Sequence, residues 1–340
     1  MRITDTIKYC RDIRDMYRTR PALTSGRISY ANWWKEDVGD SWFTRFLNFY
    51  YPKCMTPVKF YSVFGKRDNI REPFYGVKIF YTGENLEPRI HYEKNHEWIE
   101  KAAVWDRRIR DYQDYAMQEV DLALGFGEHT ENQYLRFPFW LLRFTDPEDQ
   151  VEDIQKKIDA IESSFHQVSS ARKDAVLVAT HDFLGTRDRI CREAGQVLRI
   201  EYGGKWRNSS DRLWNEFHDD KNAYLSQFRF NICPENMDAP GYVTEKLFDA
   251  FRAGCIPIYH GNRNYPEPQV LNQSSIIFWD YTTGADNAEQ VALLRELNED
   301  DVRYREFLSQ PVFCDGAAEF IYNTYLMPLR DKLGQLLSQS

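Results

Sequence analysis

The feature that most constrains this chain of 340 residues is the stretch FRFNICPENMDAPGYVTEKLFDAFRAGCIPIYHG at residues 228–261. An apolar run of strand length opens it, and a second run, Cys255–Tyr259, closes it. Between the two runs lie apolar residues at helical spacing with a glycine C-cap behind them, namely Val243, Leu247, Ala250, Phe251 and Gly254. Two strands joined by a helix form a parallel βαβ unit, so this stretch predicts an α/β fold.

The rest of the chain repeats this alternation of short apolar runs and helical patterns. Further strands are expected at Arg27–Asn32, Val58–Phe64, Gly76–Tyr81, Ala175–Thr180 and Ile276–Trp279. Strands or buried segments are expected at Val120–Phe126 and Phe137–Phe144. Residues Asp146–Ser163 form a polar helical pattern that bridges the halves. Because 340 residues exceed what one core usually serves, we expect two domains, 1–165 and 166–340. We expect the final helix to be interrupted at Pro328, and packing of this helix back on the first domain stays open.

Composition narrows the classes of partner. The net charge is −8 and no block of consecutive Lys or Arg occurs, which argues against a nucleic-acid or anionic-membrane surface. The six cysteines are scattered, without Cys-x-x-Cys or metal-ligand spacing, so we expect them to be reduced. The first twenty residues are too charged for a signal peptide, and no run of about 18 apolar residues occurs. We therefore expect a cytoplasmic protein without a transmembrane segment, and peripheral attachment at the inner membrane stays open.

One charged pair stands at the start of the central helix. Glu245 and Lys246 occupy its first turn, where unpaired N–H groups and the helix dipole favour an anion. A cation is unfavourable there, and a bound diphosphate would remove the conflict. Adjacent helical residues project about 100° apart, so Glu245 can face sugar hydroxyls while Lys246 faces phosphate. The alternative is an ordinary solvated ion pair on a helix surface.

Several motifs resemble those of the α1,3/α1,4-fucosyltransferases of glycosyltransferase family 10, particularly the bacterial members. The donor-binding motif of that family is similar to Phe230–Asn236, Gly241–Lys246 and Gly254–Ile258. Further similar segments follow in the family's order at Tyr30–Trp34, Phe80–Asn85, Asp121–Phe126, Tyr134–Pro138 and Gly203–Asn208. The resemblance covers residues 27–280, and the block at 228–261 is its most specific part.

The resemblance implies a GT-B fold, with two Rossmann-like domains that face a central cleft, the acceptor domain first and the GDP-fucose domain second. It implies inverting transfer of L-fucose from GDP-β-L-fucose to O3, or alternatively O4, of GlcNAc in an N-acetyllactosamine-type glycan such as a Lewis antigen or a lipopolysaccharide O-antigen. The chain contains no Asp-x-Asp metal motif, so no metal or other cofactor is expected to be required. Stimulation by Mn²⁺ or Mg²⁺, the acceptor type and the oligomeric state stay open.

The same resemblance assigns roles to individual residues. Glu84 matches the general base, which removes the proton of the attacking hydroxyl. Arg187 and Lys246 match cations that meet the charge on the leaving diphosphate, although Arg189 and Arg192 are close neighbours in sequence. Contacts to the ribose, fucose or base of the donor are expected from Asn236, Tyr242, Glu245 and Glu235. Trp33 and Trp34 are candidates for stacking on the acceptor, or else for one core side chain and one lid.

Two departures and three alternatives remain. Residues 89–113 look like an insertion whose apolar face forms an amphipathic helix with Trp98, Ala102, Trp105, Ile109 and Tyr112. Pro234 stands where relatives often carry Phe. Other readings are a GT-B enzyme for another nucleotide sugar, a non-catalytic glycan- or nucleotide-binding protein, and a hydrolase that pairs Glu84 with a second carboxylate such as Glu87.

Overall fold

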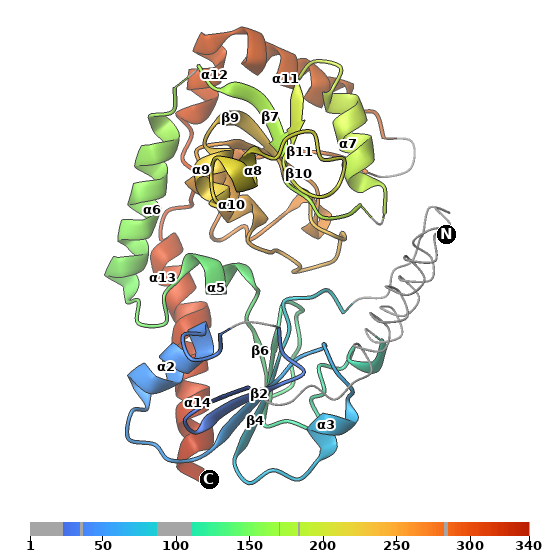
Figure 1. Ribbon diagram of the computed structural model, residues 1–340. Helices are drawn as coiled ribbons and strands as arrows, with labels where there is room; N and C mark the ends of the chain where they lie inside the picture. Colours follow the sequence, from blue (N-terminus) through green and yellow to red (C-terminus); the bar gives the residue numbers. More distant parts are fainter. Residues whose placement is uncertain are drawn as a thin grey trace, which may run out of the picture. The chain divides into compact units, whose positions relative to one another are not determined.

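The computed structural model describes residues 23–34, 37–86, 110–169, 171–182, 184–281 and 285–339 (Figure 1). The chain divides into two compact units. Unit 1 comprises Met1–Asp149 with Tyr322–Ser340, and unit 2 comprises Gln150–Ile321. Each unit is built on its own mainly parallel β-sheet with helices around it, so the α/β class follows for both.

The sheet of unit 1 has six strands in the order β1-β2-β3-β4-β5-β6, which is also their order along the chain. β1 pairs with β2 in antiparallel fashion, and all other pairs are parallel. The strands are β1 Leu23–Ser25, β2 Ile28–Ala31, β3 Val58–Tyr61, β4 Val77–Tyr81, β5 Leu122–Gly125 and β6 Tyr134–Arg136. The described helices of this unit are α2 Trp42–Tyr50, α3 Asp68–Arg71, α5 Trp140–Phe144 and α14 Met327–Gln339.

The sheet of unit 2 is parallel throughout, with the order β11-β10-β9-β7-β8. Its strands are β7 Lys173–Leu177, β8 Ile200–Tyr202, β9 Phe228–Ile232, β10 Ile256–Tyr259 and β11 Ile277–Phe278. All five residues of the central strand β9 are buried, as expected of a parallel strand covered on both faces. The α-helices of unit 2 are α6 Val151–His166, α7 Thr186–Ala194, α8 Arg212–Asn215, α9 Lys221–Leu225, α10 Lys246–Arg252, α11 Ala288–Glu299, α12 Asp301–Leu308 and α13 Ala317–Ile321.

Helix α6 belongs to unit 2, whereas the expected domain boundary at residue 165 assigns it to the first domain. The helix begins with a capping box between Gln150 and Asp153. Its buried side chains, Ile154, Ile158, Ile161 and Phe165, recur at helical spacing. They form the face that packs on α10, α12 and α13, and this packing explains why the unit boundary lies at residue 149.

Two segments are defined more closely by the structure than by the sequence. Phe137–Phe144, expected as a strand or a buried segment, is a buried segment, since Phe137, Trp140, Leu141 and Phe144 are buried. It is not a strand, because β6 ends at Arg136 and the helix α5 begins at Trp140, two residues after Pro138. The C-terminal helix is interrupted by a π-helical turn, Tyr322–Leu326, directly before α14. Pro328 lacks the N–H that a regular helix needs, which accounts for the irregular turn beside it.

Candidate active site

Unit 2 contains a topological switch point. β7 lies between β8 and β9, so the chain first adds a strand on one side of β7 and then crosses to the other side. In open parallel sheets, ligands bind outside the carboxyl ends of the strands at such a point. The loops that leave β7 and β9 here carry His181 and Asp182, and Glu235 and Asn236. Strand order alone therefore marks this edge as a candidate ligand site.

Arg187 bridges the two loops of the switch point. The Asp182 carboxylate caps α7 by accepting the backbone N–H of Arg187 at 3.2 Å and that of the next residue at 2.7 Å. The Arg187 guanidinium donates to the His181 carbonyl at 2.6 Å and to Asn236 Oδ1 at 2.7 Å. Burial lowers the pKa of Arg187, and nearby carboxylates oppose that shift. Because arginine stays protonated in proteins, the edge carries a fixed cation.

The carboxylate of Glu235 is enclosed by its own chain. Its Oε1 accepts the backbone N–H of Thr244 at 2.8 Å and the hydroxyl of Tyr259 at 3.5 Å. Its Oε2 accepts from Lys246 Nζ at 2.9 Å, and the Thr244 hydroxyl lies 2.8 Å from the same oxygen. The Glu235 side chain has 0% of its surface exposed and that of Lys246 has 17%. The structure thus places Glu235 behind Lys246 instead of on a surface that a ligand touches.

This arrangement changes the electrostatic argument made from the sequence. The unfavourable cation in the first turn of α10 is compensated within the chain by Glu235, without a bound diphosphate. Burial lowers the pKa of Lys246, but Glu235 and Glu245 together raise it by more, so the pKa lies above the ordinary value for lysine. Lys246 is therefore a protonated cation at the surface of the switch point.

Tyr242 and Glu245 complete the loop between β9 and α10. Gly241 has a φ of 75°, in the left-handed region that favours glycine, and its N–H donates to Asn262 Oδ1 at 2.7 Å. The next residue, Tyr242, is buried at 2% exposure. Glu245 is half-buried; burial raises its pKa, but Lys246 and Lys221 lower it more, so the carboxylate stays ionised. The segment from Glu235 to Lys246 thus contains the five polar residues that were predicted, besides Arg187, as donor contacts, and Asn236 accepts a hydrogen bond from Arg187.

In unit 1, Glu84 follows β4 at the carboxyl edge of the sheet. Its backbone N–H donates to Thr82 Oγ1 at 3.0 Å, and its side chain is half-buried. A Cβ on the preceding Gly83 would lie 2.6 Å from the ring of Phe139, so the missing side chain lets this ring pack against the loop. Gly83 therefore permits close packing of Phe139 against the Glu84 loop.

The two tryptophans after β2 differ in environment. Trp33 is 3% exposed, and its ring contacts Tyr30 at 4.9 Å and Phe60 at 5.9 Å between centroids. Trp34 is half-buried and lies 5.8 Å from the ring of Tyr81, the last residue of the strand that leads to Glu84. Of the two predicted acceptor contacts, Trp33 is a core side chain, and Trp34 keeps part of its surface exposed.

Models of known families match both units. The model described as glycosyltransferase family 10 (fucosyltransferase) C-term matches residues 169–310, which include the switch point. The model of the alpha-(1,3)-fucosyltransferase FucT N-terminal domain matches residues 28–144, which include Glu84 and both tryptophans. The chain belongs to glycosyltransferase family 10.

Individual relatives agree with this family-10 assignment. The chain is 25% identical over 271 residues to the alpha-(1,3)-fucosyltransferase FucT of Helicobacter pylori, covering 69% of this chain and 50% of the relative. It is 22% identical over 294 residues to the GDP-fucose protein O-fucosyltransferase 3 of Xenopus laevis, covering 81% and 57%. The chain thus spans between half and three-fifths of the length of these curated relatives.

Solved structures show the same fold. A crystal structure of an alpha1,3-fucosyltransferase with GDP-fucose superposes with a TM-score of 0.60 at 20% identity, over 96% of this chain and 95% of that chain. The crystal structure of an alpha1,3-fucosyltransferase with GDP gives the same TM-score and coverage. These likenesses confirm the predicted GT-B fold class of the family-10 chain.

Sequence reasoning missed the residues that hold the predicted ones in place. Asp182 accepts from the backbone N–H of Arg187, and Thr244 accepts from the Lys246 ammonium. Tyr259 donates its hydroxyl hydrogen to Glu235. The usual N-cap pattern does not mark Asp182, because it lies three residues before Gly185, the N-cap of α7. No local sequence pattern marks Thr244 or Tyr259, because Glu235, which both side chains bind, is distant in sequence. Of the five apolar residues predicted on one face of the insertion helix, Tyr112 alone lies within the described residues, and its ring stacks on that of Phe80 at 5.4 Å between centroids. The other four, and Glu87, lie outside the described residues.

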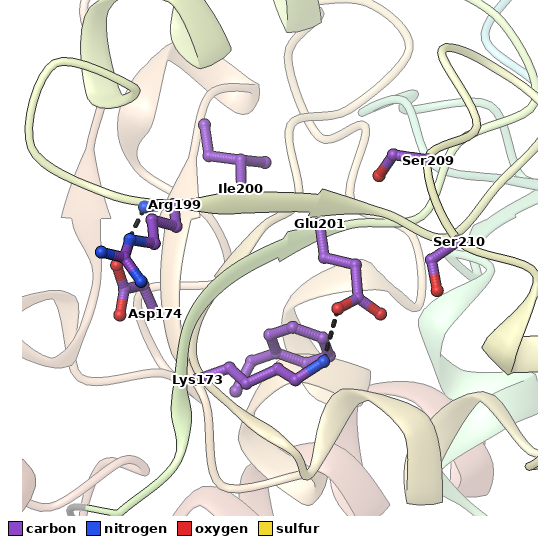
Figure 2. A pocket seen from close by; sticks show the side chains of 8 residues that line it. Lys173, Asp174, Arg199, Ile200, Glu201, Ser209 and Ser210 are labelled. Carbon is purple, nitrogen blue, oxygen red and sulfur yellow. Dashed lines mark hydrogen bonds and ion pairs between the residues drawn. The ribbon is translucent and has the colours of Figure 1, made fainter.

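A separate pocket of about 520 Å³ opens at the opposite, amino edge of the unit 2 sheet (Figure 2). Lys173 crosses it to pair with Glu201 at 2.7 Å, and its ammonium lies 5.6 Å from the ring centroid of Phe228. Asp174 and Arg199 line the same pocket. None of the predicted site residues lines this pocket, so it is distinct from the switch-point site.

Metal-ligand clusters and membrane-spanning helices are both absent from the part of the chain that the structure describes. No group of three or more His, Cys, Asp or Glu side chains there is arranged to hold a metal ion. Among the helices that the structure describes, none combines the length and the apolar character needed to cross a membrane.

Proposed function

We propose that this family-10 chain is an inverting fucosyltransferase that moves L-fucose from GDP-β-L-fucose to O3 or O4 of GlcNAc in a lactosamine-type glycan. The observation that carries the proposal is the cationic pair Arg187 and Lys246 at the switch point, within the segment matched by the fucosyltransferase family model. The relative from Helicobacter pylori is named as an alpha-(1,3)-fucosyltransferase, which supports this donor and linkage.

The donor half of the reaction is assigned to unit 2. Departure of GDP leaves negative charge on the diphosphate, and fixed cations stabilise that charge most in the transition state. Arg187 is held by His181 and Asn236, and Lys246 by Glu235 and Thr244, so neither cation has to reorganise during transfer. Asn236, Tyr242 and Glu245 are the proposed contacts to the ribose, fucose or guanine.

The acceptor half is assigned to unit 1. Glu84 is the proposed general base, because a sugar hydroxyl needs its proton removed as it attacks the anomeric carbon. One in-line displacement converts the β linkage of the donor into an α linkage, so no covalent intermediate is needed. Trp34 is the proposed ring on which the acceptor stacks, since it lies beside the strand that carries the Glu84 loop.

The deciding experiment is a GDP-release assay with GDP-fucose and type 1 and type 2 disaccharides. We expect acceptor-dependent release from the wild type and a loss of about 10²–10⁴-fold in Glu84→Gln, with GDP affinity retained. Glu72→Gln, an exposed carboxylate before β4, is the matched control and should behave as wild type. Equal activity of the Glu84 and Glu72 variants would remove Glu84 as the base.

A second candidate acceptor is a protein hydroxyl. It is favoured by the similarity to the GDP-fucose protein O-fucosyltransferase 3 of Xenopus laevis. That similarity covers 81% of this chain, whereas the similarity to the Helicobacter pylori relative covers 69%. Adding a folded protein acceptor and GDP-mannose to the panel separates this reading and a different nucleotide-sugar donor from the first proposal. Release of free fucose without any acceptor would instead indicate a hydrolase.

Location and metal dependence are part of the same proposal. Five described cysteines, Cys54, Cys191, Cys233, Cys255 and Cys314, are free thiols, which fits the reducing cytoplasm. We propose turnover without a required metal, with Mn²⁺ or Mg²⁺ as stimulants to be tested by adding each ion and EDTA to the GDP-release assay.

A further inference from the structure

Lys246 has a limited number of hydrogen atoms to offer a ligand. Its ammonium has three, and two of them point at Glu235 Oε2, 2.9 Å away, and at Thr244 Oγ1, 2.7 Å away. With 17% of the side chain exposed, the third hydrogen is the one that can face outward. A flexible lysine held by two partners in this way has its remaining hydrogen fixed in direction.

The partners that hold Lys246 are themselves held and are shielded from solvent. Thr244 is 3% exposed and Glu235 is 2% exposed. The backbone of Thr244 and the hydroxyl of Tyr259 both donate to Glu235 Oε1. Gly261 passes so close that a Cβ there would lie 2.8 Å from Glu235 Cγ. Glu235 therefore cannot rotate outward without displacing backbone from the loop after β10.

We propose that Glu235 is a positioning residue that acts through Lys246: directly, and together with Thr244, it holds the Lys246 ammonium charged and with one hydrogen directed at the departing diphosphate. The inference rests on the proposed function and deepens it. It replaces the direct donor contact that the sequence suggested for Glu235 with an indirect role. The phosphate oxygens then meet Lys246 in an orientation set before the donor binds, which is how electrostatic preorganisation lowers a barrier.

The charge of Glu235 gives the proposal a signature in pH. The charged or titratable groups near this corner come from several elements and their loops: Glu235, Glu245, Arg187, Lys221, Asp249, Tyr259, Tyr242 and Cys233. Burial and Arg187 lower the pKa of Lys246, and the two glutamates raise it. Removing the charge of Glu235 therefore lowers the pKa of Lys246, so that Lys246 loses its proton at a lower pH than in the wild type.

The test compares Glu235→Gln with Glu201→Gln. Glu201 is the matched control because it also pairs with a lysine, at 2.7 Å, and accepts a tyrosine hydroxyl, at 2.9 Å, but at the opposite edge of the same sheet. We expect kcat to fall about 10–100-fold in Glu235→Gln, since small misplacement of a catalytic group has effects of this size. The basic limb of its pH profile should move to lower pH, and Glu201→Gln should show neither change.

A second pair of variants covers the case in which Glu235→Gln fails to fold. Thr244→Val removes the hydroxyl that links the two charges but keeps the backbone N–H, and Thr244→Ser keeps both. We expect a loss of about 10-fold in kcat for Thr244→Val and near wild-type turnover for Thr244→Ser.

Calorimetric titration with GDP between pH 7 and pH 10 separates this inference from the proposed function. We expect GDP binding by Glu235→Gln to weaken at a lower pH than in the wild type. A wild type that turns over GDP-fucose beside a Glu235→Gln variant with unchanged kcat and pH profile overturns the positioning role alone. Equal losses in Glu235→Gln and Glu201→Gln also overturn it. A wild type that binds GDP but shows no turnover with any acceptor overturns the proposed function.

Discussion

The carboxyl edges of the two sheets are built in different ways. In unit 2, the order β8-β7-β9 creates a switch point, and its loops hold ionised side chains in a dense set of hydrogen bonds around Arg187 and Lys246. In unit 1, the described strands follow one another in chain order, and the rings around Trp33 and Trp34 lie beside Tyr81, the last residue of the strand that leads to Glu84.

This difference teaches what each edge can do. A buried charge is costly unless hydrogen bonds and counter-charges surround it, so a site for a charged diphosphate has to be fully built before the ligand arrives. Aromatic rings need only packing to be fixed, and they offer flat apolar faces to a neutral sugar. We therefore expect substitutions of the charged residues at the unit 2 edge to change turnover, and those of the two tryptophans at the unit 1 edge to divide between stability and acceptor affinity.

Within unit 2, the largest effect is expected for Arg187→Met. The variant removes a cation fixed by His181 and Asn236, and kcat/KM for GDP-fucose should fall about 10³-fold, as when one preorganised donor is lost from a transition state. The matched control is Arg192→Met, an exposed cation on the same helix. Initial rates at several donor concentrations measure both variants.

The same pair settles which arginine of α7 acts on the donor. If Arg192→Met loses as much activity as Arg187→Met, the switch point is not the donor site, and the contrast between the two edges breaks down. A normal kcat in Arg187→Met with a raised KM would mean that Arg187 binds the ground state and the transition state equally.

The sequence predicted the strands that form the two edges better than the side-chain contacts between them. Apolar runs located β4, β7, β9 and β10 within a few residues because buried parallel strands are nearly continuous in apolar side chains. The short strand β8 was missed, since its three residues, Ile200–Tyr202, are only half-buried. Without β8, the switch point between β7 and β9 could not be predicted, and strand order is the feature that locates the unit 2 site.

The candidate site was predictable where a residue's role depends on local sequence. Lys246 lies in the first turn of a helix that the apolar periodicity predicts, whereas Arg187 was assigned through the resemblance to family 10. The enclosure of Glu235 was not predictable, because Tyr259 and Gly261 approach it from the next strand and its loop. The burial of Trp33 beside the exposure of Trp34 also depends on packing between strands, which a single sequence does not reveal.

The second prediction compares these two tryptophans. Trp33→Ala should lower the free energy of unfolding by about 3 kcal/mol, since it empties space among Tyr30, Phe43 and Phe60. Trp34→Ala should have a smaller effect on unfolding but raise the acceptor KM about tenfold, because stacking on a sugar is lost. Scanning calorimetry and acceptor titrations measure the two effects. A raised acceptor KM in a stable Trp33→Ala variant would show that its ring reaches the ligand after all.

The smallest effect is expected at the loop that carries Glu84. In Gly83→Ala, the new Cβ would lie 2.6 Å from the Phe139 ring, so either the ring or the loop must move, at a cost of about 1–3 kcal/mol. Because φ at Gly83 is not in the left-handed region, crowding is the sole source of strain, and Phe139→Leu in the same chain should relieve most of it. We expect kcat to drop severalfold in the single variant and to recover in the double variant, with GDP affinity unchanged in both. Failure of the double variant to recover would mean that the Glu84 loop is positioned by contacts other than Phe139, and that packing does not fix this edge as hydrogen bonds fix the other.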